Sequence, residues 1–180
     1  MKELSLNVLD ITENSVKAGA TLIRILLEET EETLTITITD DGCGMKEEIL
    51  RGVIDPFYTT RTTRRVGLGI PLFKMAAEQT GGEIRITSRH ESEFPETHGT
   101  EVVATFYKQH IDFTPMGDII STVTTLIQGS PHIDFEFRHD FGELHVRLDT
   151  RELRGILGAD IPLNTPEIIR WIRDYLQEQY

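Results

Sequence analysis

The chain has 180 residues, of which 38% are hydrophobic and 27% are charged, a composition typical of globular rather than disordered proteins. Its formal net charge of −12 argues against a nucleic-acid or anionic-membrane partner, because like charges repel, yet leaves room for a nucleotide in a local pocket. With one cysteine and no apolar run long enough to span a bilayer, we expect a cytoplasmic protein without internal disulfides.

Hydrophobic periodicity predicts alternating helices and strands up to about residue 107. Alternation of Thr with Leu or Ile gives the clearest strand, at 33–39, and Pro71 suits the first turn of a helix. The expected elements, in chain order, are a helix at 3–18, strands at 21–28 and 33–39, a short helix at 46–52, a loop at 55–69, a helix at 70–79, and strands at 83–89 and 100–107.

The pattern restarts after Tyr107, so we place a boundary between Lys108 and Met116 and expect two units, 1–108 and 109–180. The second unit should be a small α+β appendage with a hairpin turn near Gly142. Its expected elements are a helical stripe at 119–127, alternating strands at 133–137 and 144–148, and a last helix that Pro166 opens and Asn164 or Thr165 caps.

Three polar side chains share one face of the first predicted helix, because Asp10, Asn14 and Lys17 are spaced four and three residues apart. Such a set suits a triphosphate: an amide oxygen can ligate Mg²⁺, an ammonium can meet a phosphate, and a carboxylate can orient or deprotonate a nucleophile. The simpler alternative is an exposed helix face with no ligand.

Two glycines, Gly67 and Gly69, come directly before the helix expected at 70–79. Glycine lets backbone N–H groups approach a ligand, and a helix N-terminus attracts anions. Arg61, Arg64 and Arg65 lie just upstream and add positive charge. A GxG pair alone is a weak signal, and the GxxxxGK[ST] pattern of P-loop enzymes is absent.

The stretch DDGCGM (40–45) ends the strand at 33–39 with two acids and two glycines around Cys43. It predicts either a tight turn or a place where a ligand meets a carboxylate and a bare backbone. Cys43 should pack as a small, inert side chain beside any such pocket.

Taken in order, these stretches resemble the four motifs of the GHKL ATPases, the superfamily of gyrase, Hsp90, histidine kinases and MutL. The resemblance covers about residues 4 to 107, and the order and spacing of its motifs make it specific. DITENSVKAGAT (10–21) is similar to the N box, DDGCGM (40–45) to the G1 box, DPFYTTR (55–61) to the F box and GLGIPL (67–72) to the G2 box.

The resemblance implies a two-layer α/β sandwich of the Bergerat ATP-binding type with ATP and Mg²⁺ as cofactors. It implies that Asn14 ligates Mg²⁺, that Asp40 hydrogen-bonds the adenine amino group, and that Thr100 lies near the adenine. The remaining implied nucleotide-binding residues are Lys17, Gly42, Gly44, Phe57, Thr60, Arg61, Gly67, Leu68 and Gly69.

Departures from the sensor kinases shape the expected function. None of the six histidines lies in a phosphoacceptor context, and no dimerising helix pair precedes the N box, so autophosphorylation of the usual kind is not expected. Asp10 stands where MutL-like members carry a catalytic Glu, and anti-sigma-factor serine kinases, which are similarly small and stand-alone, also have an acid there. The resemblance therefore implies a protein kinase acting in trans, or a weak ATPase, with Asp10 as base; the alternative is a non-catalytic, nucleotide-gated regulatory module.

In residues 109–180 we identify no resemblance to a family. They could form a homodimer contact, dock a protein partner or add to the core, and the helical stripe around Trp171 is more typical of core packing. The partners expected are ATP and a protein, for which a neighbouring gene is a candidate source, with no nucleic acid and no membrane.

Overall fold

The computed structural model describes residues 3–54 and 68–180. Its helices are α1 (Leu4–Lys17), α2 (Glu47–Ile54), α3 (Gly69–Gln79), α4 (Ile119–Gly129), α5 (Thr150–Leu157) and α6 (Pro166–Gln179). Its strands are β1 (Leu22–Glu29), β2 (Thr33–Asp40), β3 (Glu83–Arg89), β4 (Gly99–Tyr107), β5 (Asp134–Phe141) and β6 (Leu144–Asp149). The helices and strands expected from periodicity are confirmed within a few residues, and α5 has no counterpart among them. The loop expected at 55–69 lies, except for its last two residues, outside the described part of the chain.

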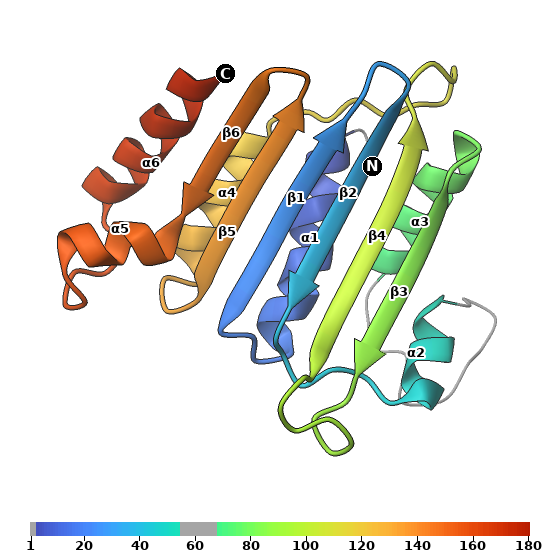
Figure 1. The fold of residues 1–180 in the computed structure, drawn as a ribbon, viewed down its shortest axis with the longest axis horizontal. Coiled ribbons are helices and arrows are strands. Elements are labelled where there is room, and N and C mark those ends of the chain that lie inside the picture. The colour runs from blue at the N-terminus through green and yellow to red at the C-terminus, as the bar shows by residue number, and fades with distance from the viewer. Residues whose placement is uncertain (1–2, 55–67) are drawn as a thin grey trace.

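The strands form one mixed sheet in the order β3-β4-β2-β1-β5-β6 (Figure 1). Neighbouring strands are antiparallel except for β1 and β5, which run parallel over eight residues, from Leu22 opposite Asp134 to Glu29 opposite Phe141. Helices α1, α3 and α4 lie behind this sheet in Figure 1. The predicted two-layer α/β sandwich is therefore confirmed.

The core lies between the sheet and this helical layer. Along β2 the residues alternate strictly between buried and half-buried, as the Thr–Leu/Ile alternation predicts, because successive strand residues face opposite sides of a sheet. The largest fully buried side chains come from both halves of the chain: Phe73, Phe106, Phe135 and Phe137. No helix in the described part of the chain is both long and apolar enough to cross a bilayer.

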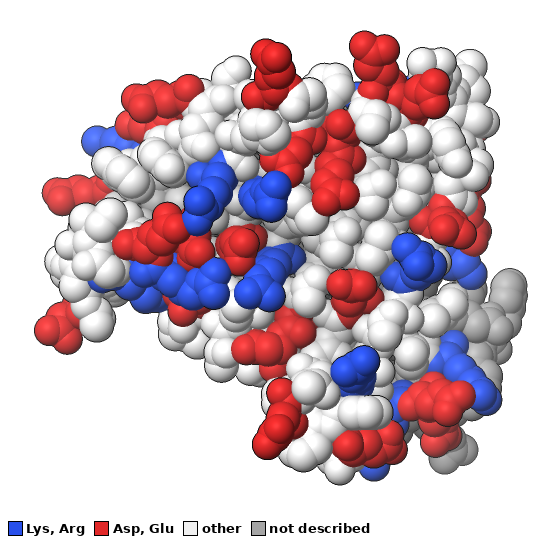
Figure 2. Space-filling model, in the orientation of Figure 1, with Lys and Arg blue, Asp and Glu red and all other residues white. Residues whose placement is uncertain are grey.

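The opposite face of the sheet carries charged side chains of both signs among uncharged ones (Figure 2). On this face the carboxylate of Glu136 accepts hydrogen bonds from Arg24 on β1 and from Arg151 on α5, at 2.9 and 3.0 Å. Such exposed pairs contribute little to stability.

The segment between the two predicted units caps α1. The backbone N–H groups of Leu4 and Ser5 donate to the carbonyls of Pro115 and Met116, both at 2.8 Å. The first N–H groups of a helix lack partners inside the helix. These two bonds satisfy the first two of those groups, and α1 has no side-chain cap at Glu3.

Residues 109–180 join the sandwich by extending its sheet through β5 and β6. Helix α6 buries Ile172 and Leu176, while Trp171 and Tyr175 stack on each other at 5.0 Å between ring centroids and stay about half exposed, at 48% and 39%. The stripe thus has a core side and an aromatic edge open to solvent. The division of the chain into two units at 108–116 stays a prediction.

Candidate functional site

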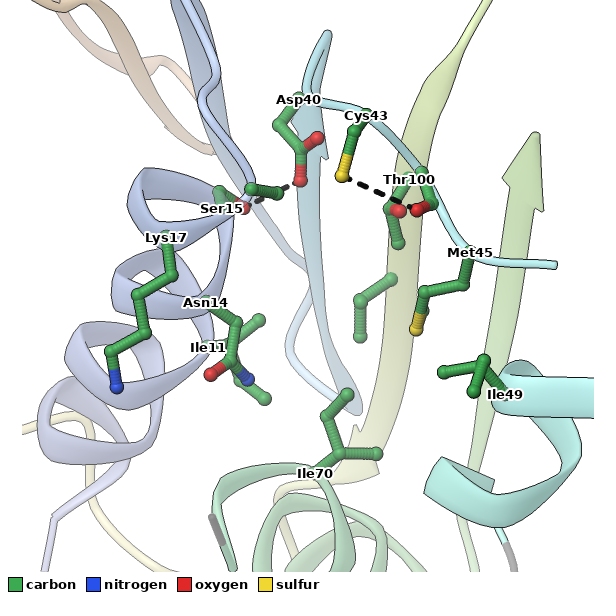
Figure 3. Close-up of a pocket in the computed structure, with 13 residues that line it drawn as sticks. Ile11, Asn14, Ser15, Lys17, Asp40, Cys43, Met45, Ile49, Ile70 and Thr100 are labelled. Atoms are coloured by element: carbon green, nitrogen blue, oxygen red, sulfur yellow. Dashed lines mark hydrogen bonds between the residues drawn. The ribbon is translucent and has the colours of Figure 1, made fainter. Parts of the chain in front are cut away.

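A cavity of about 270 Å³ opens where α1, α2 and α3 meet the ends of β2 and β4. Figure 3 shows Asp40 and Thr100 toward one end, Ile70 toward the other, and Asn14 on the α1 side. The lining residues are Ile11, Asn14, Ser15, Lys17, Ala18, Asp40, Cys43, Gly44, Met45, Ile49, Ile70, Thr100 and Val102.

Asp40 is a buried carboxylate held from two sides. It ends β2 and is only 9% exposed. The hydroxyl of Ser15 donates to its Oδ2 at 2.6 Å, and the backbone N–H of Gly42 donates to its Oδ1 at 2.9 Å. An ionised carboxylate offers about four acceptor positions, so these two bonds fix its orientation and leave acceptor capacity for a ligand.

The turn after Asp40 has room only for glycine at two positions. A Cβ on Gly42 would lie 2.8 Å from the Cβ of Ala18. Gly44 has φ of +71°, which favours glycine, and a Cβ there would lie 1.9 Å from the carbonyl oxygen of Arg89. The glycines are therefore required by close packing around the cavity wall.

Asp41, the second acid of the stretch, is exposed and is not among the described residues that line the cavity. Its carboxylate accepts hydrogen bonds from the Thr21 hydroxyl and from the backbone N–H groups of Thr21 and Leu22, the latter two at 2.7 and 3.0 Å. Partial burial alone would raise the pKa of Asp41, but these hydrogen bonds outweigh it and lower that pKa. Asp41 thus ties the turn to the start of β1.

The polar face predicted on the first helix is divided in the structure. Asn14 and Lys17 are both lining residues, although in Figure 3 the Asn14 side chain lies toward the cavity and the Lys17 side chain runs along the outer side of α1. Asp10 is absent from the described lining. Asp10 instead lies where α1 meets the start of α3: a Cβ on Gly69 would be 3.3 Å from the Cβ of Asp10. The carboxylate-bearing residue therefore lies beside the N-terminus of α3.

A chain of hydroxyl contacts supports the cavity wall near Thr100. The Thr100 hydroxyl lies 2.8 Å from that of Ser88, and the Ser88 oxygen accepts the backbone N–H of Met45 at 2.7 Å. Strands β3 and β4 thereby hold the segment that enters α2.

A family model described as "Histidine kinase-, DNA gyrase B-, and HSP90-like ATPase" matches residues 2–110. The chain belongs to this ATPase family. Among curated relatives, the tetrathionate sensor histidine kinase TtrS of Salmonella typhimurium is 34% identical over 80 residues, which are 44% of this chain and 13% of the kinase. The heme sensor protein HssS of Staphylococcus saprophyticus is 30% identical over 102 residues, 55% of this chain and 21% of the sensor.

This ATPase-family chain thus spans only about a tenth to a fifth of the length of the curated relatives it matches. Among solved structures, the ADP-complexed MutL ATPase domain of Aquifex aeolicus superposes with a TM-score of 0.56 at 13% identity, covering 87% of this chain and 69% of that one. That coverage reaches beyond residue 110, so the shared fold includes part of the C-terminal segment.

Several predicted nucleotide-binding residues of this ATPase domain are brought together at the cavity: Asn14, Lys17, Asp40, Gly44 and Thr100. Two neighbours lie close by, since Gly42 donates to Asp40 and Gly69 begins α3, whereas the side chain of Leu68 is 71% exposed. Four others, Phe57, Thr60, Arg61 and Gly67, lie outside the described residues. Their predicted roles, like those of the first group, stay predictions.

The apolar part of the lining was not predicted as a site: Ile11, Met45, Ile49, Ile70 and Val102. These residues follow the ordinary periodicity of buried helix and strand faces, so nothing in their pattern distinguishes a cavity wall from a core. Cys43 was expected as a buried thiol beside the pocket; it does line the cavity, but it is only half-buried.

Proposed function

We propose that this chain binds Mg²⁺-ATP in the cavity, with the adenine against Asp40 and Thr100 and the phosphates toward Asn14, Lys17 and the start of α3. ATP binding follows from the family; the orientation and the metal are the proposal. One observation carries the orientation: the buried carboxylate of Asp40 lies at one end of a cavity whose middle is lined by Ile and Met side chains.

Base chemistry explains why Asp40 would select adenine. Burying a carboxylate is costly unless it is hydrogen-bonded, and Ser15 and Gly42 supply two bonds while leaving acceptor positions open. Adenine presents an amino donor where guanine presents a carbonyl acceptor. A fixed carboxylate therefore attracts the first base and repels the second, while the apolar walls contact the ring faces.

Mg²⁺ fits the oxygen donors of this site, although the protein would supply only part of its ligands. Among the described residues no group of three or more His, Cys, Asp or Glu side chains could hold an ion. Mg²⁺ is commonly held by one or two protein oxygens together with substrate phosphates and water. Asn14 offers one amide oxygen from α1 at the cavity. The ion would neutralise charge on the phosphates, and Lys17 would add a positive charge beside them.

For the activity, we propose transfer of the γ-phosphoryl group to a partner protein in trans, or slow transfer to water, with Asp10 as the general base. The position of Asp10 beside Gly69, at the N-terminus of α3, supports this role, because a helix N-terminus favours the anionic phosphates that the base must approach. A protein partner, encoded nearby, would supply the acceptor hydroxyl or imidazole.

One observation favours a second candidate, a non-catalytic module that grips a partner when ATP is bound. Asp10 is not among the described residues that line the cavity. In that case residues 109–180, with the half-exposed Trp171–Tyr175 stack, would carry the contact to a partner or to a second copy.

Single-turnover kinetics with γ-labelled ATP separates these candidates. With Asp10 as base, Asp10→Asn should leave ATP affinity nearly intact and slow label transfer or ADP formation roughly a hundredfold. Glu13→Gln is the matched control, because Glu13 is an exposed acid on the same helix. The reaction is run with and without lysate of the source cell. Tight ATP binding with no labelled protein and no ADP above background would refute the enzyme and leave the gated module.

A further inference from the structure

The loop between β3 and β4, residues 90–98, is attached to the turn that follows Asp40. Two successive carbonyls of that turn accept hydrogen bonds from the loop. The Cys43 carbonyl accepts the backbone N–H of Glu91 at 2.8 Å. The Gly42 carbonyl lies 2.5 Å from Nδ1 of His98. Residues at both ends of the loop, Glu91 and His98, therefore bind the turn.

His98 contacts Gly42, two residues along the chain from the Asp40 carboxylate that lines the cavity. Gly42 donates its N–H to Oδ1 of Asp40, and its carbonyl is the group that His98 contacts. The backbone of Gly42 is thus bound on both sides, and a Cβ at this position would collide with Ala18. Loss of the His98 bond would free one side of the residue that orients Asp40.

We propose that His98 is a positioning residue for the base end of the cavity, acting on the ligand through Gly42 and Asp40. This inference rests on the proposed orientation of ATP, with its base at Asp40. His98 is not among the described residues that line the proposed ATP cavity. It lines a second depression of about 290 Å³, and Asp40 and Thr100 line both. Its influence on the base is therefore indirect.

The chemistry of the contact defines the variants that test it. A carbonyl oxygen only accepts, so Nδ1 of His98 must carry the proton. Asparagine places an amide N–H₂ at the same distance along the side chain as Nδ1 and can donate in its place. Alanine removes the donor. His98→Asn should therefore keep what His98→Ala loses.

The experiment measures ATP and GTP affinities of wild type, His98→Ala and His98→Asn by calorimetry with Mg²⁺, alongside thermal unfolding. His98→Ala should weaken ATP binding by about fivefold or more, the scale of one hydrogen bond, and lower the ATP-to-GTP preference. His98→Asn should recover most of both. His132→Ala is the control, because His132 is an exposed histidine on the loop before β5.

Unchanged ATP affinity and preference in a folded His98→Ala variant would overturn the role of His98 alone. A wild type that binds no ATP, or prefers GTP, would instead refute the proposed function. A loss of affinity that His98→Asn does not recover, with the preference for ATP retained, would mean that His98 only stabilises the loop. If His98→Ala does not fold, a folded His98→Gln variant, whose longer side chain displaces the donor, takes its place with the same expected loss of affinity and preference; unchanged ATP affinity and preference in that variant would refute the inference.

Discussion

Replacing Asp40 by asparagine tests the proposed base recognition with almost no change in shape. In the structure both carboxylate oxygens accept a hydrogen bond, Oδ2 from the Ser15 hydroxyl and Oδ1 from the Gly42 N–H. The Gly42 backbone donor cannot turn, so the amide oxygen of Asn must face it. The amide nitrogen then faces Ser15, whose hydroxyl can rotate to accept.

This rearrangement keeps the turn but removes the negative acceptor from the cavity. The variant would present N–H donors and a neutral oxygen to the adenine amino group. Hydrogen bonds to charged groups contribute about 1.5–3 kcal/mol, so the expected loss is at least tenfold in ATP affinity, about 1.4 kcal/mol, and up to about a hundredfold.

Calorimetry with Mg²⁺-ATP and Mg²⁺-GTP measures this loss, and Asp41→Asn provides a matched control. Asp41 is the adjacent acid, and its carboxylate bonds Thr21 and Leu22 rather than facing the cavity. Asp41→Asn should therefore retain wild-type ATP affinity. Equal affinity of the wild type for ATP and GTP, or an Asp40→Asn variant that binds ATP as tightly as wild type, would show that Asp40 does not read the base.

Asn14→Ala should keep the fold, since Ala is a good helix former, and abolish the dependence of ATP affinity on Mg²⁺, which titrations with and without EDTA would show. Gly44→Ala should lower the free energy of unfolding by more than about 2 kcal/mol, because its Cβ would overlap the Arg89 carbonyl. Gly142→Ala is the control: Gly142 has φ of +59° and its Cβ would meet nothing within 4 Å, so the free energy of unfolding should fall by only about 1 kcal/mol. Denaturant titrations measure both changes. Because the pKa of Asp41 is lowered by folding, its ionised carboxylate stabilises the fold fully at a pH above its ordinary pKa of 3.8. This stabilisation is lost as the pH falls through the lowered pKa. Acid unfolding curves of wild type and Asp41→Asn should therefore converge at low pH.

Local patterns predicted local structure well. The Thr–Leu/Ile alternation gave β2 because one face of that strand is buried along its whole length. Helix α5 was missed because it is short and mostly exposed: it buries only Thr150 and Leu153, leaves Ile156 81% exposed, and begins at an Asp149 cap that reads equally well as a turn. Short helices of this kind depend on what they pack against.

The pairing of strands that are distant in the sequence could not be predicted. No pattern in β1 or β5 shows that residues more than a hundred positions apart run parallel in one sheet. The same limit applies to the site. Asn14 and Asp40 could be predicted as candidate site residues because their types and spacing suggest chemistry, and both line the cavity. The cavity itself depends on the placement of Ile49 and Ile70, which only the assembled fold determines.

The parallel pairing of β1 with β5 also affects how far the chain can be shortened. A chain cut at residue 110, where the family match ends, would turn β1 into a sheet edge with the apolar sequence LIRILL and a row of unpaired backbone groups. Long apolar edges of this kind template intermolecular strand pairing and aggregation. By pairing with β1, the C-terminal segment covers the edge strand that residues 2–110 would otherwise expose.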